Sequence, residues 1–323
     1  MKHSCVYRLH RDRALRGRAW LPPVAAFFAV LAFGCSSSPE ETASAVPATA
    51  DYEPQIAAFR QEREQSLREP DSWLTLVGLF WLREGRNSVG SGGDNQVVLP
   101  QGKAPETAGV LVVEQGKARI EVASGVSITH EGQPVTELKL EDDSGGNPTI
   151  LKHGPLQFYV IERSGRLAVR VKDCESEALR NFTGLDYYPA AEDWRIEAQF
   201  EPYEEAVELE MPNYLGAPTQ ETSPGALVFE IEGTTYRTDA ISDGPSHFLV
   251  FADSTNGSET YGGGRFLRVE LPDEAAPVTL DFNKAYNPPC VFTPYATCPL
   301  PPPQNKLTAS VRAGEKAYAS AAH

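Results

Sequence analysis

From Trp73 to about residue 283 the chain is a succession of short apolar runs divided by glycine, proline, asparagine and aspartate. Two of these runs, 194–200 and 206–211, alternate apolar and polar residues, which is the pattern of half-buried strands. Tight-turn sequences separate neighbouring runs at 114–117 and 162–166. Further strands are expected at 97–99, 109–113, 118–122, 126–129, 156–161, 167–171, 227–231, 234–238, 247–252, 265–271 and 278–283.

One segment near the start departs from this pattern. Residues 53–69 contain helix formers throughout, with Ile56, Phe59 and Leu67 available for one face and Pro70 as a stop. The sequence therefore predicts a mainly β protein. We expect a β-sandwich or barrel-like fold with one N-terminal amphipathic helix and a proline-rich C-terminal loop.

Residues 1–34 have the organisation of an export signal. Six basic residues and the single acid Asp12 precede an uncharged run at 19–34, which is too short for a spanning helix of about 20 apolar residues. The segment 31–35 ends at Cys35 and resembles the bacterial lipobox, in which the cysteine is acylated after cleavage. Ser36 resembles the signal that sorts such lipoproteins to the outer membrane. The alternative is ordinary cleavage to a free protein.

The charge of the chain limits its partners. The formal net charge is −15, and removal of residues 1–34 changes it to −20, because six positive charges and one negative charge are lost. A body this acidic repels nucleic acid, so no nucleic-acid partner is expected. We expect contact with a membrane through the lipid anchor, and a small molecule or an envelope protein as partner.

The chain divides into four predicted parts. They are a lipoprotein signal peptide at 1–34, a flexible tether at 35–50, the helix with a first β region at 51–150, and a C-terminal β domain at 151–323. We expect the mature protein to lie in the cell envelope, on the outer membrane facing the periplasm or exported and membrane-anchored.

The loop 281–305 in the C-terminal domain is the predicted site of function. Seven prolines fix φ along it, which lowers the entropy of holding polar side chains in place. The alternative is that the loop only caps one end of the β-fold. The guanidinium of Arg265 is expected to bind a carboxylate, either one within the protein or one on a ligand. The candidate ligand-binding residues are His247, Tyr261, Arg265, Asp281, Asn283, Tyr286, Asn287 and Asn305.

The three cysteines that follow the predicted tether suggest one disulfide bond. In an oxidising envelope Cys290 and Cys298 are expected to form a short disulfide, and Cys174 is expected to be an unpaired thiol in an acidic turn. Weaker alternatives are a metal site completed by His247 and Asp281, or a Cys290 nucleophile with His247 as base. The sequence has no G-x-S-x-G, H-E-x-x-H, P-loop or G-x-G-x-x-G motif, so no metal and no cofactor are predicted.

Two families resemble parts of the chain. Residues 86–91, 94–95 and 97–100 resemble the opening strands of a forkhead-associated (FHA) domain, a likeness that extends over 74–135. The Ser-x-x-His that holds phosphothreonine in that family has no counterpart after Pro100, so the resemblance implies the β-scaffold and not the phosphopeptide site.

The second resemblance is to the DUF1684 family. It is carried by residues 72–82, 184–189, 259–262 and 264–267, and above all by 281–303, and it spans residues 53 to about 317. The family has no established activity, so this resemblance implies kinship and no reaction. Binding of a partner or small ligand is the favoured function. An envelope hydrolase or redox enzyme with Asp281, Asn283, Asn287 and a cysteine in working roles is the alternative.

The lipid anchor can be tested in envelope membranes. We expect a palmitate analogue to label the mature protein and the label to disappear in Cys35→Ala, because the thiol carries the acyl chain. Ser37→Ala is the matched control and should keep the label. Label that persists after Cys35→Ala contradicts the assignment.

Overall fold

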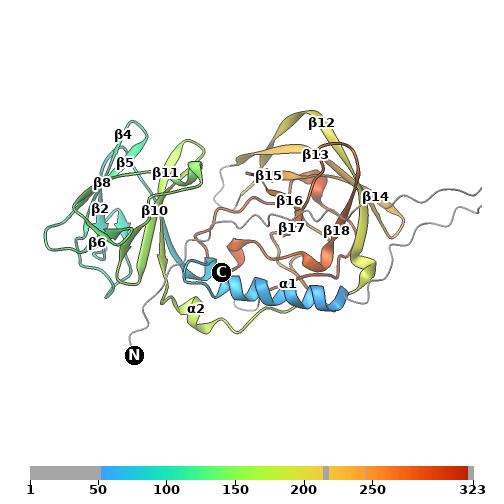
Figure 1. The fold of residues 1–323 in the computed structure, drawn as a ribbon, viewed down its shortest axis with the longest axis horizontal. Coiled ribbons are helices and arrows are strands. Elements are labelled where there is room, and N and C mark those ends of the chain that lie inside the picture. The colour runs from blue at the N-terminus through green and yellow to red at the C-terminus, as the bar shows by residue number, and fades with distance from the viewer. Residues whose placement is uncertain (1–51, 214–217, 245, 319–323) are drawn as a thin grey trace, which may run out of the picture.

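The computed structural model describes residues 52–213, 218–244 and 246–318, which form two lobes (Figure 1). Within this part of the chain there are four sheets, antiparallel except for one short pair of strands, and few helices. The expected mainly β fold is therefore confirmed. No helix in these ranges has the length and apolar character needed to cross a membrane.

The first lobe is a sandwich of two sheets that share one core. A six-stranded sheet in the order β1-β11-β10-β9-β6-β7 faces a five-stranded sheet in the order β3-β2-β4-β5-β8. Leu111 and Ile120 of one sheet and Phe158 and Val169 of the other are buried in this core. The strands are β1 Leu76–Trp81, β2 Gly85–Gly90, β3 Val97–Val98, β4 Gly109–Glu114, β5 Lys117–Val122, β6 Ile128–His130, β7 Gln133–Val135, β8 Glu137–Leu140, β9 Leu151–His153, β10 Leu156–Arg163 and β11 Arg166–Asp173.

The boundary predicted after residue 150 falls inside this lobe. The strands β9, β10 and β11 follow residue 150, yet they pair in one sheet with β1 and β6, and Thr129 lies opposite Lys152. The first β region therefore extends to Asp173. The reason is that the hairpin β10–β11 supplies the inward face that closes the sandwich core.

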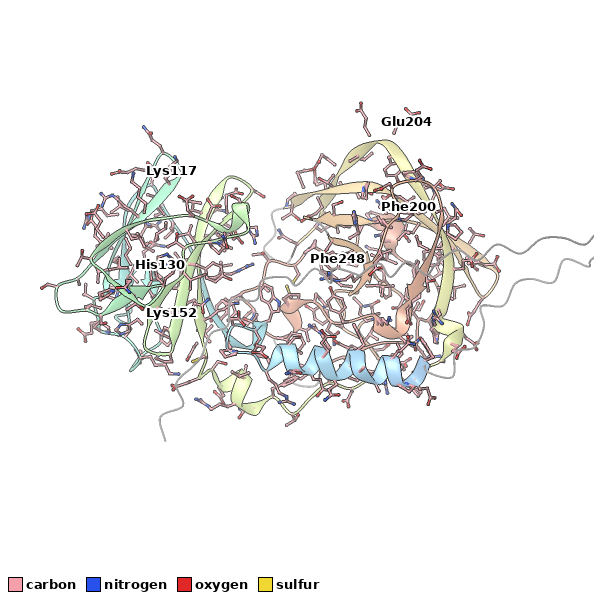
Figure 2. The ribbon with its side chains drawn as sticks, in the orientation of Figure 1. Lys117, His130, Lys152, Phe200, Glu204 and Phe248 are labelled. Atoms are coloured by element: carbon pink, nitrogen blue, oxygen red, sulfur yellow. The ribbon has the colours of Figure 1, made fainter. Side chains whose placement is uncertain are left out.

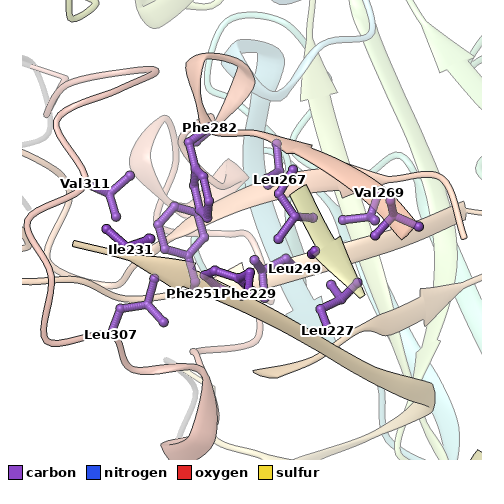
Figure 3. Close-up of a cluster of buried hydrophobic side chains, with 14 of the residues drawn as sticks. Leu227, Phe229, Ile231, Leu249, Phe251, Leu267, Val269, Phe282, Leu307 and Val311 are labelled. Carbon is purple, nitrogen blue, oxygen red and sulfur yellow. The ribbon is translucent and has the colours of Figure 1, made fainter. Parts of the chain in front are cut away.

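The second lobe is built from two further sheets. A four-stranded sheet has the order β14-β13-β12-β18, and a three-stranded sheet has the order β15-β16-β17. Figure 3 shows their shared core, in which the rings of Phe251 and Phe282 meet edge to face with centroids 5.3 Å apart. The strands are β12 Arg195–Met211, β13 Thr219–Ile231, β14 Thr234–Asp239, β15 Ile241–Asp243, β16 Ser246–Phe251, β17 Arg265–Val269 and β18 Pro277–Asp281.

The N-terminal helix α1, Tyr52–Leu67, confirms the predicted helix but lies on the second lobe, not on the first β region (Figure 1). The hydroxyl of Tyr52 donates to Asp281 at 2.8 Å, and the guanidinium of Arg60 donates to the carbonyl of Tyr188 at 2.7 Å. Near the end of the helix, Arg68 donates to the carbonyl of Phe182 at 2.9 Å. These contacts make the helix part of the C-terminal body.

Short helices complete the structure. They are α2 Glu177–Asn181 and the 3-10 turns η1 Trp73–Thr75, η2 Asp143–Gly145, η3 Glu192–Trp194, η4 Phe282–Lys284, η5 Pro289–Val291 and η6 Pro303–Asn305. Three of these turns lie within the predicted proline-rich loop. Proline begins η5 and η6 and fixes φ in the range that a 3-10 turn requires, whereas η4 is capped by Asp281, whose carboxylate accepts from the backbone N–H of Asn283. The loop is therefore ordered without a sheet ladder of its own.

The C-terminal segment passes close to this loop at Gly314. This residue has φ +76°, and a Cβ atom there would overlap the carbonyl oxygen of Ala285. Only glycine meets both requirements without strain.

Gly314→Ala tests this close approach. We expect a loss of about 3–5 kcal/mol in the free energy of unfolding, because the cost of a left-handed φ adds to the displacement of the backbone around Ala285. Gly233→Ala is the matched control: it has the same φ of +76° with open space around it, so it should cost only about 1–2 kcal/mol. Chemical denaturation measures both values, and equal losses would contradict the close approach.

Candidate functional site

A groove of about 1540 Å³ lies between the two lobes, beside α1 and over the outer face of the sheet β15-β16-β17. The first lobe contributes Asp143 and Arg163 to its lining, and the second lobe contributes most of the rest. Figure 2 shows Phe248, one of the lining residues, on the side of the second lobe nearer to the first. A groove of this size is large enough for a small organic ligand.

An aromatic strip, formed by Phe248, Phe266 and Tyr286, lines the groove. Strand alternation places it there, because Leu249 and Leu267 point into the core and their neighbours Phe248 and Phe266 point outward. The centroids of Phe248 and Phe266 are 6.5 Å apart, and those of Phe266 and Tyr286 are 6.1 Å apart. Tyr286 is held in place by two backbone hydrogen bonds with Phe266, both of 2.9 Å.

An arginine lies over each end of the aromatic strip. The guanidinium carbon of Arg268 is 5.2 Å from the centroid of Phe248, and that of Arg63 is 4.9 Å from the centroid of Tyr286. Arg63 is neutralised by Glu315, whose buried carboxylate is 2.9 Å from its Nε. Arg268 is exposed and donates to the hydroxyl of Ser246 at 3.0 Å. Among the described side chains no carboxylate forms an ion pair with Arg268.

A second charged group lines the groove near the start of α1. Asp281 accepts from the hydroxyl of Tyr52 at 2.8 Å and lies 3.6 Å from the ammonium of Lys284. The guanidinium of Arg195 covers the ring of Tyr52 at 5.1 Å. Burial and the hydrogen bond to Asp281 raise the pKa of Tyr52, so this hydroxyl remains a proton donor at neutral pH. The Asp281 carboxylate is thus occupied by internal partners.

Three of the eight predicted ligand-binding residues line the groove: Asp281, Tyr286 and Asn287. Asn283 and Asn305 are buried and use their amides internally. Asn283 donates to the hydroxyl of Tyr52 at 2.7 Å and accepts from the backbone of Ala191, and Asn305 bonds to the backbone of Asp239 through both atoms of its amide. These two residues hold the loop against neighbouring segments.

Arg265 was expected to bind a carboxylate, either within the protein or on a ligand, and in the structure it binds the carboxylate of Asp253. Its Nη2 is 2.7 Å from Asp253, and both side chains are fully buried. It also donates to the carbonyl oxygens of Ala313 and Val311, the latter at 2.7 Å. Arg265 therefore ties the C-terminal segment to β17 in the second lobe and does not line the groove.

His247 and Tyr261 lie away from the groove. His247 is on the opposite side of β16 from Phe248, and partial burial lowers its pKa, so it is neutral at physiological pH. Tyr261 packs against the cluster that includes Leu67 and Phe292. Among the described residues no cluster of three or more His, Cys, Asp or Glu side chains joins His247 to Asp281 as a metal site, and the hydrogen bonds of Cys290 do not include His247 as a base.

Sequence reasoning missed Arg63, Phe248, Phe266 and Arg268. The alternation within 246–251 and 265–269 was a usable signal, because both stretches place large side chains on the face opposite the core. The position of Arg63 had no such signal, since its partner Glu315 is 252 residues away.

The cysteines differ from expectation. Cys290 and Cys298 are free thiols, so the predicted disulfide is not formed in this structure. Cys174 is disulfide-bonded, and the prediction that it is unpaired is wrong. Cys35, with the predicted signal peptide and tether, lies outside the described residues.

Comparison with known proteins places the second lobe in a family. Residues 180–316 match the family described as "Protein of unknown function (DUF1684)", a shorter span than the expected 53 to about 317. An uncharacterized protein of Haloarcula marismortui, solved in solution, is 33% identical; the match covers 42% of this chain and 78% of that one, with a TM-score of 0.35. A comparison with curated proteins returned no match.

FHA domains also resemble this chain over a little under a third of its length, as expected from the sequence. The FHA-2 domain of a Mycobacterium tuberculosis ABC transporter is 23% identical; the match covers 28% of this chain and 77% of that one, with a TM-score of 0.22. The FhaA FHA domain, solved in complex with the intracellular domain of another protein, is 20% identical; the match covers 29% of this chain and 97% of that one, with a TM-score of 0.21.

The role of Asn287 can be tested by stability. Its amide donates to the carbonyl of Lys316 at 2.8 Å, so Asn287→Ala should cost about 1–3 kcal/mol, the effect of leaving a buried carbonyl without its donor. Asn181→Ala, at an exposed position, is the control and should change stability by less than about 0.5 kcal/mol. Thermal denaturation compares the two. A melting temperature for Asn287→Ala that equals that of the control would rule out the structural role.

Proposed function

This chain belongs to the DUF1684 family of proteins of unknown function, and we propose that it is a lipid-anchored binding protein of the cell envelope. Its ligand is a small organic anion with an aromatic or apolar body, held in the groove between the lobes. The observation that carries the proposal is the aromatic strip with Arg268 over its end.

The chemistry of the groove supports this class of ligand. The rings of the aromatic strip offer a surface on which an apolar or aromatic body can stack, with a gain of about 0.5–1.5 kcal/mol for each ring pair. Arg268 offers a planar set of donors that suits a carboxylate, phosphate or sulfonate. A ligand that contacts both Arg268 and the aromatic strip pairs its anionic group with the guanidinium and covers the half-buried rings with its apolar body.

The strong acidity of the chain opposes anion binding, most directly through the carboxylates that line the groove, of which Asp143 is paired with Arg163 and Asp281 with Lys284. The Debye length at physiological ionic strength is about 8 Å, so distant carboxylates are largely screened from the groove. A guanidinium in direct contact with the anion is little screened, and a charge-assisted hydrogen bond contributes about 1.5–3 kcal/mol. The local contact therefore dominates over the net charge of −15.

Binding is better supported than hydrolysis. A hydrolytic site needs a nucleophile within hydrogen-bonding reach of a base, and the candidate base His247 lies on the other side of β16 from the groove. Among the residues that line the groove, the carboxylate of Asp281 is occupied by Tyr52 and Lys284. The alternative partner is an envelope protein in place of a small molecule, and dye binding distinguishes the two.

The cellular place of the protein rests on its sequence. Cys35 is the proposed acylation site, and residues 35–50 supply the proposed tether between the membrane and the two lobes. The groove would then be presented to small molecules of the envelope, close to the membrane surface.

Anilinonaphthalene sulfonate, an aromatic anion that fluoresces when it leaves water, tests the groove. We expect saturable binding to the mature protein and a dissociation constant raised about five- to tenfold by Arg268→Gln, because the charge-assisted contact is lost. Phe248→Ala should weaken binding by a similar factor through the loss of stacking.

The controls are matched in chemistry and placed away from the groove. Arg237→Gln removes an exposed guanidinium paired with Glu201, and Val207→Ala removes an exposed apolar side chain. Neither should change the dissociation constant. If Arg237→Gln weakens binding as much as Arg268→Gln, the dye reports overall charge and the proposed site is rejected. Absence of saturable dye binding would favour a protein partner.

A further inference from the structure

Two buried thiols lie side by side where the proline-rich loop meets the first lobe. The backbone N–H of Cys290 donates to the sulfur of Cys298 at 3.2 Å, and the backbone N–H of Cys298 donates to the sulfur of Cys290 at 3.3 Å. Their exposed fractions are 8% and 5%. This reciprocal arrangement brings the two sulfur atoms together and gives each one a donor.

A buried arginine of the first lobe faces this pair. Arg170 on β11 is 6% exposed, donates to the hydroxyl of Thr297 at 3.2 Å, and lies 5.2 Å over the ring of Trp73. Its Nε has no hydrogen-bond partner, and among the described residues no carboxylate forms an ion pair with it. An uncompensated buried cation is costly, so this position favours an anion nearby.

The two thiols are not equivalent. A hydrogen bond from Cys298 and the positive charge of Arg170 lower the pKa of Cys290, whereas burial raises the pKa of Cys298. The thiol of Cys290 also reaches the carbonyl oxygen of Ala296, but at 3.6 Å this contact is weaker than the donors directed at its sulfur. Cys290 is therefore the thiol that ionises first, and Cys298 stays protonated when Cys290 is a thiolate.

We propose that Cys290 and Cys298 form a thiol–disulfide exchange site for a small disulfide, with Cys290 as the attacking sulfur and Cys298 as the resolving one. The Cys290 thiolate attacks one sulfur of the disulfide, forms a mixed disulfide and releases the first thiolate. Cys298 then passes its proton to the released thiolate and attacks the sulfur of Cys290, which forms the Cys290–Cys298 bond and releases the second thiolate. Two protein thiols are oxidised and one small disulfide is reduced.

The groove supplies the route to the thiols. Trp73 and Phe266 line the groove and also pack against the cluster that contains both cysteines. Pro289 and Thr297, each adjacent to one of the cysteines, line the groove as well. Neither cysteine lines the groove itself, so a small disulfide has to displace these side chains to reach Cys290. The inference goes beyond anion binding, because it requires neither Arg268 nor a charged ligand.

Exchange with 2-hydroxyethyl disulfide tests the site in the mature protein. This reagent carries no charge and no ring, so the result does not depend on anion binding. Trypsin releases the peptide 285–306, which contains both cysteines, so acid-quenched samples can be read by mass spectrometry. We expect the mixed disulfide to appear first on Cys290 and then to give way to an internal bond that lacks two hydrogens. A first adduct on Cys298, or no reaction in the folded protein, would overturn the proposal.

Single-thiol variants assign the two roles. Cys298→Ser should form a stable mixed disulfide at Cys290 at least about tenfold faster than Cys290→Ser forms one at Cys298, since reactivity follows the fraction of thiolate. Equal rates, or the opposite order, would overturn the assignment. If either variant fails to fold, the order of adducts in the wild-type peptide still decides the question.

The role of Arg170 as a positioning residue is tested on the same readout. Arg170→Gln should slow the first step about three- to tenfold, whereas Arg170→Lys should restore most of the rate because it keeps the charge. Arg166→Gln, on the same strand but over Trp81, is the matched control and should react like wild type. A loss in Arg170→Gln that Arg170→Lys does not recover would show a packing effect and reject the electrostatic role.

Discussion

The carboxylate of Glu315 joins three segments that are far apart in the sequence. It accepts from Arg63 of α1 at 2.9 Å and from the backbone N–H of Asn287 at 2.7 Å, and it is fully buried. Removing one partner of a buried ion pair costs about 3–5 kcal/mol, because the other charge is left without compensation. The groove depends on this interaction, since the carboxylate fixes both the helix on one wall and Tyr286, the residue before Asn287, on the other.

The junction between the lobes uses polar contacts on a small apolar base. Arg170 donates across it to Thr297, and the hydroxyl of Thr293 donates back to the carbonyl of Leu76 at 2.9 Å. Trp73 lies under Arg170 and packs against the cysteine cluster. Leu74 also packs against Val291 and Phe292 of the loop, so the loop that contains Thr293 and Thr297 contacts the first lobe through both polar and apolar side chains.

The sequence predicts the strands well and the site only in part. Alternation located the two halves of β12, and the turn sequence 162–166 located the hairpin β10–β11, because side-chain period and turn chemistry are local properties. The asparagines of the loop could not be sorted in the same way, since Asn283 and Asn287 have the same donors and acceptors. Their partners decide their roles, and the nearest partner of the Asn283 amide is the hydroxyl of Tyr52, 231 residues away.

The strands β16 and β17 carry the hydrophobic core on one face and the groove on the other. Insertion of a single residue into either strand would exchange these faces, placing Phe248 or Phe266 in the interior and an interior leucine on the surface. A change of length within these strands is therefore costly, and the connection between them, 252–264, is constrained as well, because its Asp253 pairs with Arg265. Substitution of a single outward side chain on these strands changes the surface of the groove alone, whereas sliding a strand by one residue also changes the core.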